Sequence, residues 1–248
     1  MIDSHCHLEQ QDYQLDRDDV IANCKKELKA VITCCANHKD FDLTMQIVER
    51  HKGFVFATVS IHPIHIEEIE EKDAVIFFDL VRKNRDKIVG IGETGLDFKI
   101  ENEESREKQK KLFIGFIKLS KELNLPLVIH ARQAFKEAVD ILEEYNARNV
   151  LMHFFTAKEL LPRIIANDWY ISVNTTLSTS KNIKKIVRDI PLERILTETD
   201  APWLGPEGTR NTPLSVKLVV EKIADIKKKS FEEVDRITTE NAISFFKL

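Results

Sequence analysis

Short apolar runs alternate with longer amphipathic stretches along the whole chain. The runs are nearly continuous in apolar residues instead of alternating with polar ones, which is typical of strands buried on both faces of a parallel sheet. This pattern predicts eight strands: Met1–His5, Ala30–Cys35, Phe54–Ile61, Ile88–Gly92, Pro126–His130, Val150–Phe154, Tyr170–Val173 and Ile195–Thr197.

The stretches between these runs carry apolar residues at three- and four-residue steps, the period of an amphipathic helix. Helices are therefore predicted over Asp16–Lys29, Asp40–Lys52, Ile69–Arg85, Glu103–Leu123, Ala134–Tyr145, Lys158–Asn167, Ser180–Arg188, Pro213–Lys227 and Phe231–Phe246. Thr212 before Pro213 is typical of an N-cap followed by proline in the first turn. Ser230 and Glu233 have the spacing of a capping box.

Eight strand-then-helix units follow one another without a linker or a change in composition. This order predicts an α/β fold, a single (β/α)8 TIM barrel over residues 1–248, because such barrels commonly have this length. An open dinucleotide-binding sheet is disfavoured, since Gly90, Gly92 and Gly95 do not have the Gly-x-Gly-x-x-Gly spacing.

Several of the apolar runs stop at a residue that can bind a metal ion. His5 and His7 are two residues apart and point to the same face of an extended strand. The carboxyl ends of all strands meet at one mouth of a barrel, so the side chains there converge. Six residues are predicted to form a metal centre at this mouth: His5, His7, Glu93, His130, His153 and Asp200. Four imidazoles and two carboxylates exceed what one ion needs and suit divalent ions.

Each of these residues has a simpler interpretation when taken alone. A single histidine at a strand end more often makes a hydrogen bond than binds a metal, and Asp200 could cap the following turn. Asp97 and Glu198 are more readily interpreted as supporting carboxylates than as ligands, and Cys6 as a small buried apolar residue. Only the six together, each at the end of a strand, favour a metal site.

Composition and charge narrow the class of protein further. A net charge of −4 and a pI near 6.1 disfavour a protein that grips nucleic acid with its whole surface, although a local phosphate site remains compatible. The four cysteines lack metal-binding or disulfide spacing, which indicates reduced thiols. With no signal peptide and no apolar run near the roughly 20 residues that span a bilayer, we expect a soluble cytoplasmic protein without membrane contact.

The metal-binding residues stand in seven short motifs that resemble, in order, those of the TatD family of metal-dependent deoxyribonucleases, within the amidohydrolase superfamily. The motifs are His5-Cys6-His7, Ile61-His62-Pro63, Gly92-Glu93-Thr94-Gly95-Leu96-Asp97, Ile129-His130-Ala131-Arg132, His153-Phe154-Phe155-Thr156, Glu198-Thr199-Asp200-Ala201-Pro202 and Arg210-Asn211-Thr212-Pro213. Each motif alone is weak, but the ordered combination is specific.

The resemblance implies a centre of two divalent ions, with Zn, Mn, Mg, Co and Ni not distinguished. By that resemblance His5, His7 and Asp200 hold one ion, His130 and His153 hold the other, and Glu93 bridges them. Asp200 is expected to orient and deprotonate a metal-activated water. His62 is expected close to the metals and to a substrate phosphate.

We therefore expect a hydrolase of DNA phosphodiester bonds, of the exonuclease type, with Asp200, Glu93 and His62 as catalytic residues. Arg132 and Arg210 could bind phosphate together with His62, although salt bridges on helix faces also explain both arginines. DNA is the expected partner, and no obligate protein partner is evident. Two alternatives stay open: a hydrolase of a small amide, lactone or phosphoester on the same barrel, and a binding protein without turnover.

Overall fold

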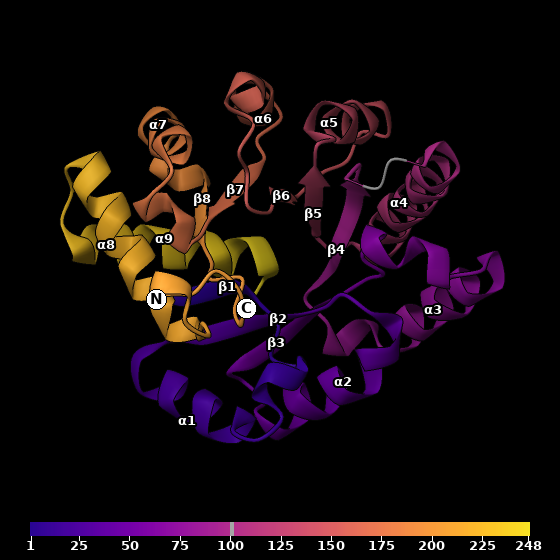
Figure 1. Cartoon of the computed structure of the whole chain (residues 1–248), viewed down its shortest axis with the longest axis horizontal. Helices are drawn as coiled ribbons and strands as arrows, with labels where there is room; N and C mark the ends of the chain where they lie inside the picture. The colour runs from indigo at the N-terminus through magenta and orange to yellow at the C-terminus, as the bar shows by residue number, and fades with distance from the viewer. Residues whose placement is uncertain (100–101) are drawn as a thin grey trace.

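The computed structural model describes residues 1–99 and 102–248 and has eight parallel strands in one sheet, in the order β1 to β8. Figure 1 shows these strands arranged in a ring with the helices outside it, so the predicted (β/α)8 barrel is confirmed. The strands are β1 (Ile2–Cys6), β2 (Ala30–Cys35), β3 (Val55–Val59), β4 (Gly90–Asp97), β5 (Leu127–Arg132), β6 (Val150–Met152), β7 (Tyr170–Val173) and β8 (Ile195–Thr197).

The last strand joins the first through hydrogen bonds instead of a regular ladder. The Thr197 hydroxyl donates to the Ile2 carbonyl oxygen over 3.1 Å, near the start of β1. Beyond the end of β8, the Asp200 amide donates to the His5 carbonyl over 3.0 Å, and the His7 amide donates to Ala201 over 2.7 Å. The ring is therefore held together at the point where three predicted metal ligands lie.

The helices occupy the predicted stretches, with shorter bounds at several ends. They are α1 (Arg17–Glu27), α2 (Phe41–Arg50), α3 (Glu71–Lys83), α4 (Glu103–Leu123), α5 (Phe135–Glu144), α6 (Leu161–Ala166), α7 (Lys181–Asp189), α8 (Val216–Lys227) and α9 (Phe231–Phe246). The Ser230 hydroxyl caps α9 as predicted, but Glu233 pairs with Lys229 and not with the cap backbone. Thr212 makes no side-chain cap, because Pro213–Ser215 forms a separate 3-10 turn before α8.

Strand β4 extends five residues beyond its predicted end at Gly92, up to Asp97, and places Glu93 inside the strand. Two glycines allow this, because they let β4 lie very close to β5. A Cβ at Gly92 would stand 2.5 Å from the Val128 side chain, and one at Gly95, where φ is +142°, would meet the His130 carbonyl oxygen. The register between the strands shifts between Ile91 and Thr94. The Glu93 side chain consequently reaches the strand that carries His130.

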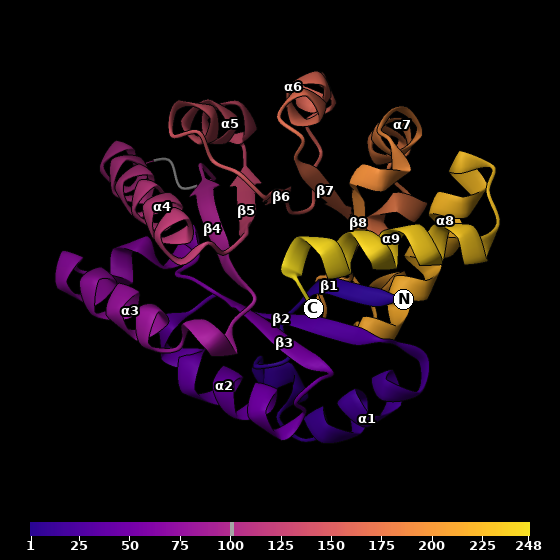
Figure 2. The same ribbon diagram turned by 180° about the vertical axis from the view of Figure 1, so that it is seen from behind.

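The end of the barrel opposite the metal-binding mouth is closed by α9. Seen from behind, this helix lies across β1 and close to both termini (Figure 2). Phe245 and Phe246 pack there against Ile2 and the buried apolar residues of other strands, and the amino terminus pairs with Asp235 at 2.8 Å. None of the helices that the structure describes is long and apolar enough to cross a membrane.

Candidate metal centre

The six predicted ligands come together at the carboxyl end of the barrel. His5 and His130 stand in β1 and β5, Glu93 in β4, and the others directly follow β1, β6 and β8. All six side chains are at most about one-fifth exposed, and those of His5, His7, Glu93 and His153 are buried. Residues separated by nearly 200 positions in the chain thus share one polar cluster, as the sequence predicts.

Glu93 lies at the centre of this cluster, and its two carboxylate oxygens face different histidines. Oε1 lies 2.7 Å from His130 Nδ1 and 3.5 Å from both His62 Nε2 and His153 Nε2. Oε2 lies 3.3 Å from His5 Nε2 and 3.9 Å from His7 Nε2. One carboxylate therefore connects two groups of nitrogen donors, the arrangement that a bridging ligand requires.

The first group lies between β1 and β8. His5 Nε2 and His7 Nε2 are 3.1 Å apart, and Asp200 Oδ1 lies 3.7 Å from the first and 3.5 Å from the second. Asp200 has a φ of 58°, in the left-handed region that non-glycine residues seldom adopt. The Asp200 amide donates a hydrogen bond to the His5 carbonyl, and in this backbone conformation the Asp200 carboxylate faces both histidines.

Three of the four predicted histidine ligands have a further carboxylate within hydrogen-bond distance of a ring nitrogen. His7 Nδ1 lies 3.2 Å from Glu9 Oε1, and His153 Nδ1 lies 2.8 Å from the buried Glu198. His130 Nε2 lies 3.2 Å from Asp97 Oδ2. Such pairs fix the tautomer and orientation of a metal-binding imidazole. Asp97 and Glu198 thus lie where supporting carboxylates are expected.

Two residues of the cluster were not predicted from the sequence. Glu9 contacts His7 and accepts a 2.8 Å hydrogen bond from the Thr33 hydroxyl. Its position two residues after His7, in the turn that follows β1, is the signal that could have found it. Cys34 lies within 4.8 Å of donor atoms of His5 and His7, and it was hidden inside an apolar run.

The carboxylates of the centre are ionised. Burial by itself would raise the pKa of Glu93, but the neighbouring His153, His62 and His130 outweigh it and hold that pKa well below its usual range. Burial would also raise the pKa of Asp200, but the hydrogen bond to His7 outweighs burial and lowers that pKa. Two buried negative charges therefore call for compensating positive charge.

In the metal-free protein, protonated histidines supply that charge. Burial disfavours the charged form of His153, but Glu198 and Glu93 raise its pKa to about 10. His7 and His130 also have raised pKa values, since their carboxylate partners outweigh burial. Burial and the neighbouring His130 lower the pKa of His62 to about 4.

The donors fit divalent metal ions. Three groups of donors each lie within 4.8 Å of one another: His5, Glu93 and His153; His62, Glu93 and His130; and His5, His7 and Cys34. Imidazole with carboxylate is the donor set of zinc and its neighbours, and the negative carboxylates supply the charge that such cations need. His62, expected near the metals, lies within one of these groups.

The two predicted phosphate-binding arginines differ in their surroundings. Arg132 is exposed at the end of β5, two residues after His130. Arg210 binds the Asp16 carboxylate through both terminal nitrogens, at 2.9 and 2.5 Å, and stacks 5.1 Å above the Tyr13 ring. The Arg132 side chain thus lies at the rim without a hydrogen bond or ion pair to the described residues, although its charge contributes to the lowered pKa of Asp97, whereas Arg210 is held in an ion pair.

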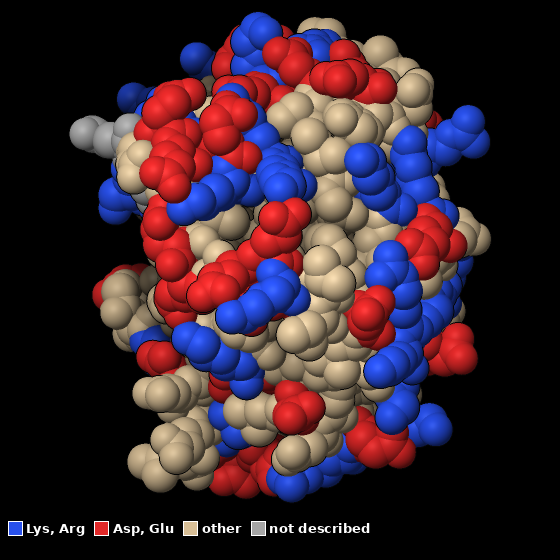
Figure 3. Space-filling model, turned by 90° about the vertical axis from the view of Figure 1, so that its right-hand side faces the viewer, with Lys and Arg blue, Asp and Glu red and all other residues tan. Residues whose placement is uncertain are grey.

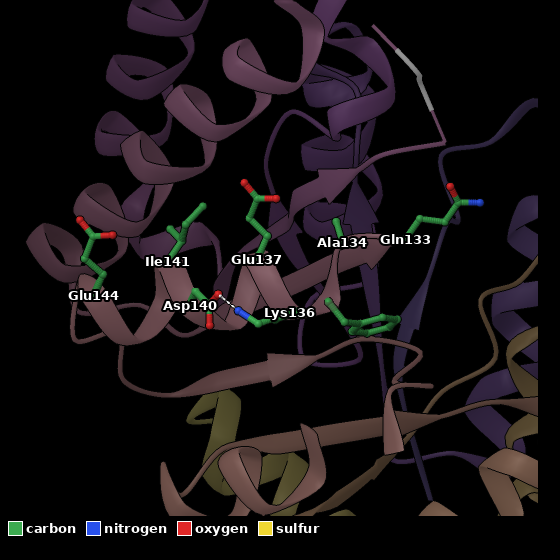
Figure 4. A pocket seen from close by; sticks show the side chains of 8 residues that line it. Gln133, Ala134, Lys136, Glu137, Asp140, Ile141 and Glu144 are labelled. Carbon is green, nitrogen blue, oxygen red and sulfur yellow. Dashed lines mark hydrogen bonds and ion pairs between the residues drawn. The ribbon is translucent and has the colours of Figure 1, made fainter. Parts of the chain in front are cut away.

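A separate pocket of about 470 Å³ lies along α5, starting directly after Arg132. Figure 4 shows Glu137, Asp140 and Glu144 along this helix, with Lys136 paired to Asp140. Its acidic lining is unsuited to an anionic ligand, and it contains none of the predicted site residues. The metal-binding mouth is therefore the site that both the sequence and the structure indicate.

A (β/α)8 barrel with histidines and carboxylates gathered around Glu93 at its mouth defines a metal-dependent hydrolase. The chain belongs to the TatD related DNase family, whose pattern matches residues 2–247. The predicted family and the predicted class of enzyme are thereby confirmed.

Individual relatives cover nearly the whole chain. Deoxyribonuclease TATDN3 of Homo sapiens is 34% identical over 258 residues, spanning 99% of this chain and 94% of the human protein. YabD of Bacillus subtilis, named an uncharacterized metal-dependent hydrolase, is 35% identical over 257 residues, spanning 100% of this chain and 99% of its own. The solved TatD homolog YJJV of Escherichia coli K12 superposes with a TM-score of 0.91 at 21% identity, covering 100% and 98% of the two chains.

Proposed function

We propose that the protein hydrolyses phosphodiester bonds of DNA near a strand end. The observation that carries this proposal is the division of Glu93 between two sets of donors, His5 and His7 on one side and His130 and His153 on the other. A carboxylate shared in this way suits a pair of ions at a phosphoryl group. Membership in a family described as DNases supports DNA as the substrate class.

Two divalent ions would be held by the predicted sets. His5, His7 and Asp200 would hold one, His130 and His153 the other, with Glu93 between them. Bound there, the ions would polarise the phosphoryl oxygens and activate a water. The donor set accepts Zn, Mn, Co, Ni or Mg, and availability would select among them.

Asp200 and His62 would act on the reacting groups. The Asp200 carboxylate is ionised and faces the histidines of β1, so it is able to accept a proton from an attacking water. His62 is neutral at physiological pH because its pKa lies at about 4, and its ring is able to donate one hydrogen bond to a phosphate oxygen. Glu93 would position the donors on both sides.

Arg132 would pair with a substrate phosphate at the rim. For Arg210 the same role requires that the phosphate replace Asp16 as its partner. Trp203, which is 46% exposed with its ring 4.8 Å from that of His7, offers a surface on which a base would stack.

The outer surface supports action at a strand end in preference to wrapping of a duplex. Figure 3 shows positive and negative side chains intermixed on the face turned toward the viewer. Exposed cations of the described residues are often paired with carboxylates, as Lys111 is with Glu71 and Lys110 with Glu137. A protein that covers long duplex needs many unpaired cations for phosphate contacts. The four cysteines are free, which fits the cytoplasmic location that we include in the proposal.

The proposal is tested by metal analysis of the purified protein together with digestion of end-labelled oligonucleotides. We expect two equivalents of divalent ion and stepwise shortening from one labelled end, abolished by a chelator. A panel of amides, lactones and small phosphoesters is assayed in parallel. Turnover of that panel without DNA cleavage would replace the substrate class, and no turnover with Mg²⁺, Mn²⁺, Co²⁺ or Zn²⁺ would indicate a binding protein.

A further inference from the structure

We propose that Cys34 supplies a thiolate ligand to the ion held by His5 and His7, and so makes this half of the centre selective for thiophilic ions. The inference rests on the metal centre of the proposed function, but not on its substrate. Zn²⁺ and Co²⁺ bind thiolate readily, whereas Mg²⁺ and Mn²⁺ prefer oxygen donors.

The geometry of Cys34 carries the first part of this inference. Cys34 stands near the end of β2, the strand beside β1, and its side chain is fully buried. Its sulfur lies within 4.8 Å of one ring nitrogen of His5 and one of His7. The Nε2 atoms of the two rings are 3.1 Å apart. Donors of a tetrahedral ion lie about 3.5 Å from each other for bond lengths near 2.0 and 2.3 Å. A small rotation of the thiol therefore completes a His₂Cys group.

A second observation points to the same ligand. Thr58 is the register partner of Cys34 on β3, so both side chains project on the same face of the sheet. Thr58 is 1% exposed, its hydroxyl has no nitrogen or oxygen partner among the described residues, and its interaction with the Cys34 sulfur lowers the pKa of that thiol. A buried hydroxyl without a partner is costly, but it becomes a donor to sulfur once the thiol is deprotonated. Thr58 is therefore positioned to stabilise a thiolate.

Ligation changes the protonation of Cys34 without any redox step. The S–H bond breaks, the proton leaves to solvent, and the sulfur electron pair forms the bond to the ion. Burial and the charge of Glu93 favour the thiol in the metal-free protein. A divalent cation at the histidines reverses this preference, as it does for other cysteines that bind metals.

Cys35 provides a matched control on the same strand. It is equally buried and adjacent in sequence, but alternation turns it to the opposite face, where its thiol donates to the Asn37 carbonyl over 3.2 Å. Valine is close to cysteine in size, so Cys34→Val and Cys35→Val each remove one sulfur with little change in packing. Thermal melting of both variants checks that they fold.

The full-length protein loaded with Co²⁺ is examined by near-ultraviolet absorption. We expect a sulfur-to-cobalt charge-transfer band in the wild type and in Cys35→Val, and its loss in Cys34→Val. Chelator competition is expected to show Zn²⁺ binding weakened about 10- to 100-fold in Cys34→Val with Mn²⁺ binding unchanged. Thr58→Val should weaken Zn²⁺ binding by a smaller factor.

A second measurement covers the case in which Cys34→Val does not fold. X-ray absorption of the wild-type zinc protein is expected to show one sulfur at about 2.3 Å. Absence of sulfur there, absence of the band in the wild type, or a band that survives in Cys34→Val overturns the inference. A sulfur ligand without DNA cleavage supports it and overturns the proposed substrate instead. DNA cleavage without sulfur at the metal leaves the proposed function standing alone.

Discussion

The two halves of the candidate centre are built differently: the β1 half contains His5, His7 and Asp200, and the β5 half contains His130 and His153. His5 lies in β1 and His7 directly follows it, so the two-residue period of extended chain brings them together, and both are buried. His130 and His153 come from β5 and beyond β6, and the side chain of His130 is 18% exposed. The first pair is fixed by local geometry, whereas the second pair exists only because the barrel sets two strands side by side. We therefore expect the β1 half to be the tighter and less exchangeable metal site.

Glu93→Gln tests what the halves have in common and should have the largest effect. The amide cannot supply two anionic oxygens, so the charge that attracts both ions is lost together with the bridge. We expect metal content to fall toward zero and nuclease activity to fall below detection. Glu144→Gln, an exposed change along α5, should retain both. A Glu93→Gln protein that still binds two ions would show that the halves are independent.

Asp200→Asn should impair the β1 half of the centre and leave the β5 half intact. The substitution preserves shape but removes a proton acceptor beside His7, a role worth about 10²- to 10⁴-fold in rate. We expect turnover to drop within that range while the ion at His130 and His153 stays bound. Single-turnover digestion of a labelled oligonucleotide and metal analysis measure the two effects. Wild-type turnover would show that the proton role is assigned to the wrong residue.

Glu9→Gln and Glu198→Gln should sharpen the contrast, because each carboxylate lies behind the histidine of one half. Loss of such a partner weakens metal binding by about 10- to 100-fold. Calorimetric titration of the metal-free protein should resolve two binding events. We expect Glu9→Gln to weaken one event and Glu198→Gln the other. If both variants weaken the same event, the two-site division is wrong.

The difference between local geometry and contacts across strands also explains which features could be predicted from the sequence. Strand periodicity and ordered apolar runs were sufficient for the barrel, and α4 and α9 begin and end where their apolar periods do. The end of β4 was predicted too early, because all residues from Glu93 to Asp97 except Leu96 are polar or small and nevertheless buried. Their burial depends on the neighbouring strand, which no local pattern encodes.

Side chains that serve the site from inside an apolar run were also beyond prediction. Cys34 is indistinguishable in sequence from the apolar residues around it, and only the pairing of β2 with β1 brings it to the histidines. Arg210 presents the converse case. Its place after β8 suggested the rim, but Asp16, almost 200 residues earlier, lies within hydrogen-bond distance. Contacts between distant segments decide both cases.

Arg132→Ala and Arg210→Ala should give the smallest and most specific difference. Arg132 is exposed beside the β5 half, so its loss should raise KM for DNA by roughly tenfold, the worth of one charge-assisted hydrogen bond, with kcat nearly unchanged. Arg210 is engaged by Asp16, so its loss should lower the melting temperature slightly and affect KM less. Lys136→Ala, in the first turn of α5 and paired with Asp140, serves as the control for removal of a nearby positive charge. A larger rise in KM for Arg210→Ala than for Arg132→Ala would mean that substrate displaces Asp16, and would move the phosphate contact from the β5 half of the mouth to the β8 half.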